Sequence, residues 1–205
     1  MKRVLLIAVI VILELGNVYA QDVKFGAKAG LNLSNVSIEI EDGVETDGKI
    51  GYNFGAFAEI SLSEKLIFQP ELLFSTQGFK VKQSIDEFSF EQTNKMNYLN
   101  VPIMFRYAVF NKFGLEVGPQ VGFLLSANSE IKETFNGESE TFDQDFKDSV
   151  KSIDFGLNFG ASYDVSENII IGARYNLGLS NINNEDGDAN KINNTVFSFS
   201  LGYRF

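Results

Sequence analysis

The chain has 205 residues, of which 44% are hydrophobic and 13% aromatic, and its formal net charge is −10. It contains no Cys and no His, which excludes a disulfide framework, the Ser-His-Asp and Cys-His catalytic arrangements and the commonest zinc ligands. The excess of carboxylates argues against a nucleic-acid partner, because phosphates are bound by Lys and Arg. The length and the even composition predict one domain.

Residues 1–20 have the features of an export signal. Two basic residues precede ten apolar residues that end at Leu13, and Ala20 stands at the spacing that signal peptidase prefers. A run of this length is too short to cross about 30 Å of hydrocarbon as a helix. We therefore predict cleavage before Gln21 and an exported domain that comprises residues 21–205.

From residue 21 onward, apolar residues recur at every second position, which is the period of a β-strand. The pattern recurs in eight blocks, at residues 25–33, 50–60, 66–75, 99–107, 113–123, 153–163, 169–180 and 195–205. Short connections at 63–65, 111–112 and 164–168 alternate with long ones at about 37–49, 79–95, 126–151 and 181–194. This alternation is typical of an up-and-down barrel with tight periplasmic turns and larger outer loops.

A soluble lipocalin-like barrel would show the same alternation over eight strands, so the size of the apolar side chains must distinguish a soluble barrel from a membrane barrel. That face is dominated by Phe, Tyr, Leu and Ile. The interior of an eight-stranded barrel has room only for close-packed side chains or one small ligand, so the bulky face must point outward into lipid. We predict an all-β, eight-stranded, antiparallel up-and-down transmembrane β-barrel with short periplasmic turns and long extracellular loops.

The opposite face then lines the lumen, and it holds four basic and four acidic residues. Unpaired charges away from water cost several kcal/mol each, so we predict a salt-bridge network that plugs the lumen. An ion path or a catalytic carboxylate pair is the alternative, which we disfavour because eight strands leave no aqueous channel. The predicted network comprises Lys28, Arg106, Arg174 and Arg204 with Glu59, Glu71, Glu116 and Asp154.

Aromatic residues gather where the blocks meet the short turns, and we predict that they form a periplasmic girdle. The closing strand alternates large apolar residues with small or charged ones, and its end on a C-terminal Phe resembles the signal recognised by outer-membrane barrel assembly machinery. This strand and the girdle predict outer-membrane lipid and that machinery as partners. The girdle comprises Phe25, Phe68, Tyr107, Phe113 and Tyr163, and the assembly signal Phe197, Phe199, Leu201, Tyr203 and Phe205.

The long loops hold 18 acidic and eight basic residues. Glu185, Asp186 and Asp188 could offer hard oxygen ligands to Ca²⁺, but their spacing does not match an EF-hand, so we favour a solvated turn and predict no metal site or cofactor. Phe142, Phe146 and Val150 have helical spacing, which predicts a short amphipathic helix on the rim.

Strand-like alternation continues into two of the long loops, at residues 36–40 and at 88 and 90. Strands that protrude from the membrane offer an edge that a partner could extend by β-augmentation, although packing of these side chains against neighbouring loops is the simpler reading. Prolines at 70, 102 and 119 lie within predicted strands, where they cannot donate to the ladder, and we expect β-bulges there.

Several segments resemble the PorT-like outer-membrane β-barrel family common in Bacteroidetes: "KFGAKAGLNLSNV", "GYNFGAFAEISLSEKLIFQPELLFSTQGFK", "YLNVPIMFRY" and "FGLEVGPQVGFLLSA". The resemblance covers essentially the whole mature chain and implies an architecture like that of the OmpA and OmpX barrels. It implies no particular activity, although some members are linked to secretion and gliding machinery.

The sequence thus predicts a non-enzymatic barrel of the cell envelope, located in the outer membrane of a Gram-negative bacterium, with a plugged polar lumen and a structural or interaction role at the cell surface. A protein partner is expected at the extracellular loops or the periplasmic turns. Three alternatives remain open: an accessory component of a secretion or gliding machinery, a narrow ion or small-solute channel, and a soluble ligand carrier.

Overall fold

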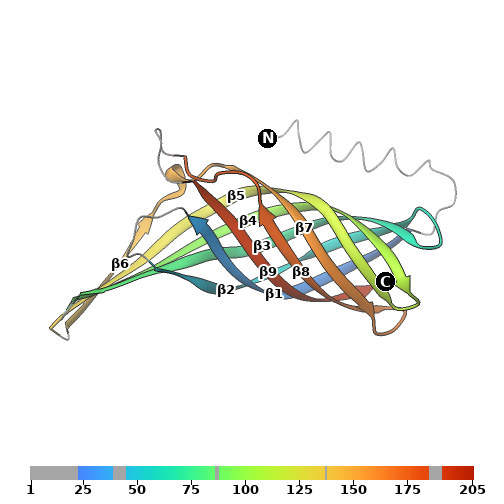
Figure 1. Ribbon diagram of the computed structural model, residues 1–205, viewed down its shortest axis with the longest axis horizontal. Helices are drawn as coiled ribbons and strands as arrows, with labels where there is room; N and C mark the ends of the chain where they lie inside the picture. The colour runs from blue at the N-terminus through green and yellow to red at the C-terminus, as the bar shows by residue number, and fades with distance from the viewer. Residues whose placement is uncertain (1–22, 39–44, 86–87, 137, 185–190) are drawn as a thin grey trace.

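The computed structural model (Figure 1) describes residues 23–38, 45–85, 88–136, 138–184 and 191–205. The predicted export signal at residues 1–20 and the acidic residues at 185–188 lie outside these ranges. Within them, no helix has the length and apolar character needed to cross a membrane.

One antiparallel sheet contains all the strands of the described ranges, and eight of them close into a ring. β1 pairs with β2 on one side and with β9 on the other, while β4 pairs with both β3 and β5. β6 stands apart from the ring because, among the residues that the structure describes, it pairs with β5 alone. The strands are β1 (Val23–Ile38), β2 (Glu45–Ser61), β3 (Leu66–Ile85), β4 (Phe88–Phe110), β5 (Phe113–Phe135), β6 (Glu138–Asp145), β7 (Ile153–Asp164), β8 (Ile169–Gly178) and β9 (Ile192–Arg204).

The predicted eight-stranded barrel is confirmed, and each of the eight blocks lies on one strand of the ring. The period of two gives every strand one apolar face and one polar face. The ring can therefore close with the apolar faces outside and the polar faces around the lumen. Leu31 and Phe199, which pair across β1 and β9, expose 64% and 59% of their surface on the outside. Their chain neighbours Asn32 and Ser198 pair with each other on the lumen side, where Asn32 is buried.

Two of the predicted long loops are largely strand, and this corrects the sequence prediction. Residues 79–95 continue β3 and β4 as a paired hairpin, and β5 runs on to Phe135, where it pairs with both β4 and β6. The sheet formed by β3, β4, β5 and β6 therefore projects beyond the rest of the ring, at the left of Figure 1. The C-terminus lies at the opposite end, with the short turns.

The amphipathic helix predicted for the third loop is not formed. Phe142 lies on β6 and pairs with Ile131 of β5. Between Phe146 and Val150 there is only a single 3-10 turn, η2 (Lys147–Ser149). Pairing with β5 satisfies the backbone groups of β6 on one side, so the chain follows the strand period here despite the helical spacing of its apolar residues.

The bulges expected at the prolines are also absent. Pro70 pairs with Ile103, and the next recorded pair is Leu73 with Asn100, so the ladder is interrupted while its register continues unchanged. Pro102 and Pro119 likewise keep their strands in register with β5 and β7. A proline lacks only its own N–H donor, so flanking pairs can hold the register across the gap. Register shifts occur instead at 48/53, 97/98 and 108/110.

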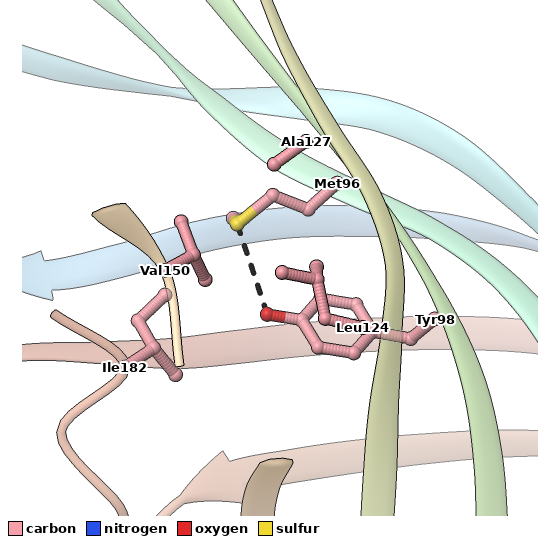
Figure 2. Packing of buried hydrophobic residues seen from close by; sticks show 6 residues of the cluster. All are labelled: Met96, Tyr98, Leu124, Ala127, Val150 and Ile182. Atoms are coloured by element: carbon pink, nitrogen blue, oxygen red, sulfur yellow. Dashed lines mark hydrogen bonds between the residues drawn. The ribbon is translucent and has the colours of Figure 1, made fainter. Parts of the chain in front are cut away.

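An apolar cluster lies at the extracellular mouth of the lumen (Figure 2). Two chain segments lie here and pair with each other, because Lys151 N–H donates to Ile182 O at 2.7 Å and Val150 forms a β-bridge with Asn183. The second segment also pairs with β9, because Ile182 N–H donates to Ile192 O at 2.8 Å. Their side chains pack against residues of β4 and β5, and Tyr98 Oη lies 3.8 Å from Met96 Sδ. We call this group the mouth cluster; it comprises Met96, Tyr98, Leu124, Ala127, Val150 and Ile182.

Candidate functional site: the lumen and the projecting sheet

The periplasmic half of the lumen holds one group of charges, the lower cluster, made of Glu59, Arg106, Asp164 and Arg204. Asp164 accepts from Arg106 Nη2 and Arg204 Nη2, both at 2.6 Å. Glu59 Oε2 lies 2.8 Å from Arg204 Nε, and Glu59 Oε1 lies 4.0 Å from Arg106 Nη1. Two guanidinium groups therefore face two carboxylates, and each of the four residues comes from a different strand.

A second group, the upper cluster, lies further along the lumen and comprises Lys28, Glu71, Glu116 and Arg174. Arg174 makes two contacts with Glu71, at 2.9 and 3.0 Å, and a third with Glu116 Oε2 at 2.7 Å. Lys28 Nζ donates to Glu71 Oε1 at 3.0 Å, and Gln69 Nε2 donates to the same oxygen at 2.7 Å. The Glu71 side chain is fully buried. Buried charges with this many donors and acceptors are of the kind that can offset their desolvation.

The eight predicted charged residues all lie on the lumen side, but they do not form one network. Asp154 lies outside both clusters and accepts instead from Ser180 Oγ at 2.7 Å and from Asn194 Nδ2 at 2.8 Å. Sequence reasoning missed Asp164, which it assigned to a turn. The strand period contained the signal, because Asp164 continues the even-numbered, lumen-facing positions that begin at Asp154 on β7.

Between the two clusters the lumen is filled by Phe57, which is 4% exposed. Its ring lies against Gly26, where an added Cβ would overlap Phe57 Cζ. Above the upper cluster, the lumen is occupied by hydrogen-bonded amide side chains. Asn53 donates to Asn32 at 2.6 Å, and Asn176 donates to Asn158 at 3.1 Å. Charged, aromatic and amide side chains thus succeed one another along the lumen axis.

Two small cavities lie within this packing. One, of about 20 Å³, is bordered by Lys28, Phe57 and Arg174, and another, of about 40 Å³, lies among the amide side chains around Asn32 and Asn158. A cavity needs about 10–15 Å³ to hold one water, so each has room for only a few waters. Glu59 of β2 and Glu71 of β3, the two carboxylates on neighbouring strands that could form an acid/base pair, are both held by arginines. In the described ranges no group of three or more acidic residues could hold a metal ion.

The predicted girdle residues lie on the outside, at the end with the short turns. Phe25, Tyr107 and Tyr163 expose between 44% and 61% of their surface, while Phe68 and Phe113 are half-buried. The rings of Phe68 and Phe105 lie 5.3 Å apart, and those of Tyr203 and Phe205 lie 5.7 Å apart. The predicted assembly-signal residues alternate outward along β9, from Phe197 to Tyr203, with Phe205 directly after the strand.

The projecting sheet differs from the membrane-level wall because its outer face is charged. Lys82 Nζ lies 2.8 Å from Asp47, and Lys80 Nζ lies 3.2 Å from Glu91. Hydrogen bonding and attraction to the Lys82 ammonium lower the pKa of Asp47, and the carboxylate in turn raises the pKa of Lys82. Every residue of β6 is exposed. Within the described ranges, the strand order ends at β6, whose far edge has no strand beside it.

Comparison with known proteins identifies the class. Residues 19–184 match the family model described as the outer membrane protein beta-barrel domain, so the chain belongs to this family. Its members are proteins of the Gram-negative outer membrane, and the closed eight-stranded ring agrees with that location. No curated protein sequence matches the chain.

Three solved structures illustrate the fold. The attachment invasion locus protein Ail of Yersinia pestis is 14% identical, over 89% of this chain and 98% of its own, with a TM-score of 0.46. Neisserial surface protein A is 16% identical, over 88% and 95%, with a TM-score of 0.45. OprG from Pseudomonas aeruginosa is 13% identical, over 90% and 97%, with a TM-score of 0.39. At these identities the likeness concerns the fold alone.

Proposed function

We propose that this protein is a non-enzymatic outer-membrane barrel with a closed lumen, which binds a protein partner at the cell surface through its projecting sheet. The observation that supports this most directly is the edge of β6. Eight residues of regular strand, about 26 Å long at 3.3 Å per residue, have a strand neighbour on one side only among the described parts of the chain. Such an edge is a template for an extended segment of another chain.

The charge of β6 suggests which segments it would accept. Glu138, Glu140, Asp143 and Asp145 are all exposed, and the strand has no basic residue. Two such edges would repel each other, which is a recognised way to prevent edge-to-edge self-association. The same charges favour an extended segment with basic side chains, so the proposed partner is a basic segment of a different protein.

The closed lumen is part of the same proposal. The mouth cluster lies over the extracellular opening, and the two charged clusters and Phe57 occupy the interior below it. Together with cavities of only about 20 and 40 Å³, this packing disfavours the narrow-channel alternative. The engagement of Glu59 and Glu71 by arginines likewise disfavours acid/base catalysis.

The finer assignments rest on the sequence. We propose that residues 1–20 are a cleaved export signal before the barrel domain at 21–205. We also propose that assembly machinery recognises the closing strand and that the protein belongs to the PorT-like group. An accessory role in secretion or gliding follows from that last resemblance, and it would place the partner at a periplasmic turn.

The test is photo-crosslinking in living cells from single replaced positions. Thr141 on β6 reports on the projecting edge, and Glu64 reports on a periplasmic turn. We expect one discrete adduct from Thr141 that disappears when Glu140→Lys and Asp143→Lys reverse the local charge. An adduct from Glu64 alone would indicate that the partner belongs to envelope machinery on the periplasmic side. Absence of any adduct from a correctly assembled protein would contradict the interaction role.

A further inference from the structure

The barrel wall divides at its extracellular end between β1 and β2. The last pair that joins these strands is Ser34 with Lys49. Beyond it, β1 continues beside β9 as far as Ile38, whereas β2 continues beside β3 as far as Glu45. The two strands therefore separate above the last pair, and the end of β1 and the beginning of β2 lie apart in Figure 1.

A cleft of about 500 Å³ lies at this division, and it is open to the outside of the barrel. Its floor is apolar and comes from three adjacent strands, because Leu33 of β1 pairs with Phe197 of β9, which pairs with Tyr175 of β8. These side chains continue the outward apolar face that Leu31 and Phe199 occupy one step lower. The floor is thus continuous with the surface that contacts lipid chains.

The wall of the cleft is basic. Lys80 and Lys82 line it together with Asp47, on the part of β2 and β3 that lies beyond the division. These two lysines differ from other surface lysines because they line the same cleft as the apolar floor.

Lys49 belongs to the lumen side of the wall and does not line the cleft, because it is only 8% exposed whereas its chain neighbour Ile50 is 75% exposed on the outside. The cleft is therefore lined by two lysines, Lys80 and Lys82, and by one carboxylate, Asp47. A positive excess at this position contrasts with the net charge of −10 of the whole chain.

We propose that this cleft binds a phosphorylated glycolipid of the outer leaflet. The lipid chains would lie along Leu33, Phe197 and Tyr175, and the phosphate would face the ammonium groups of Lys80 and Lys82. An apolar floor joined to a basic wall at the membrane boundary matches an anionic amphiphile better than a soluble anion, which would gain nothing from the floor. This site is separate from the β6 edge and does not depend on the proposed protein partner.

The test measures binding of purified full-length protein, in uncharged detergent micelles, to fluorescent rough lipopolysaccharide and to the same lipid after phosphatase treatment. We expect the wild type to bind the phosphorylated lipid about tenfold more tightly, because each lysine near a membrane surface contributes about fivefold at most in binding. Lys80→Gln with Lys82→Gln should remove this preference. The matched control is Lys151→Gln with Lys191→Gln, at exposed lysines outside the cleft, which should retain it.

Two further variants separate binding from folding. Asp47→Asn removes the carboxylate that competes for Lys82, so it should tighten binding of the phosphorylated lipid about threefold. A substitution that merely disturbed the sheet would weaken binding instead. Leu33→Ser should weaken binding of both lipids while keeping the preference for phosphate.

Three results would overturn the proposal. The first is equal affinity of the wild type for the two lipids. The second is a preference that survives the Lys80 and Lys82 substitutions in protein whose electrophoretic mobility shows an intact barrel. The third is displacement of the lipid by millimolar inorganic phosphate, which would assign the lysines to a free anion.

Discussion

Arg174 of β8 and Glu71 of β3 meet across the lumen in a two-point contact, with Nη1 2.9 Å from Oε2 and Nη2 3.0 Å from Oε1. The two residues are 103 positions apart in the chain, so their contact forms only when the ring has closed. Glu116 and Lys28 add contacts from two more strands. The upper cluster therefore joins opposite walls of the barrel from the inside.

Removing one member of this cluster should be costly. Glu71→Ala leaves the Arg174 and Lys28 charges buried with one carboxylate fewer, and we expect a loss of about 3–5 kcal/mol in the free energy of unfolding. Denaturant unfolding followed by circular dichroism measures it. Glu91→Ala, at an exposed ion pair, is the control and should cost at most about 1 kcal/mol. Equal effects of the two substitutions would show that the upper cluster does not stabilise the barrel.

The lower cluster offers a related test through Asp164, which accepts from both Arg106 and Arg204. Asp164→Asn keeps the shape but removes the charge, so two guanidinium groups would share Glu59 alone. We expect destabilisation of about 2 kcal/mol, smaller than for Glu71 because Asp164 is 23% exposed and water can replace part of the interaction. An unfolding midpoint identical to that of the wild type would contradict this.

Two glycines on the lumen side should respond differently to an added methyl group. At Gly26 a Cβ would overlap the ring of Phe57 and approach Tyr203 O to 2.6 Å, whereas at Gly172 the nearest atom is 3.4 Å away. We expect Gly26→Ala to cost about 1–3 kcal/mol through overpacking and Gly172→Ala to change stability by less than about 1 kcal/mol. Thermal unfolding of both variants, side by side, measures the difference. Tolerance of both would mean that Phe57 is loosely held.

The mouth cluster should act as a local structural unit. Ile182→Ala removes a side chain that is 2% exposed, and we expect faster amide hydrogen exchange in residues 146–152 and 180–184. Exchange in β8 and β9 below the mouth should change little. Leu179→Ala, at a side chain that is 62% exposed, is the control and should leave the mouth unchanged. Equal acceleration throughout the barrel would contradict a separate unit.

The closed lumen that we propose predicts electrical silence in a planar bilayer. Wild-type protein in 1 M KCl should show no discrete openings, because charged, aromatic and apolar side chains fill successive levels of the interior. A quadruple variant with Lys28→Ser, Glu71→Ser, Glu116→Ser and Arg174→Ser removes the upper cluster without changing the net charge, and it should admit more water. Openings in the wild type would favour the channel alternative.

The eight strands and their two faces follow from the sequence, because a period of two assigns each side chain to one side of a strand without knowledge of its neighbours. All eight charged residues predicted for the lumen were assigned to it in this way. Asp164 was missed only because the strand was ended one residue too early. The same pattern, together with the small volume of the lumen, was enough to predict that Phe25 and Phe199 point outward.

Which lumen residues meet depends on register and closure, which no single strand determines. Arg174 contacts Glu71 and Glu116 because β8, β3 and β5 lie around one narrow ring, while Asp154 lies too far toward the extracellular end to join them. The projecting sheet likewise forms because β3, β4, β5 and β6 satisfy one another's backbone groups above the membrane. The sequence by itself determined which face of each strand points outward, and only the tertiary structure decided which residues meet. The reason is that the register of each strand pair in a closed ring depends on the registers of all the other pairs.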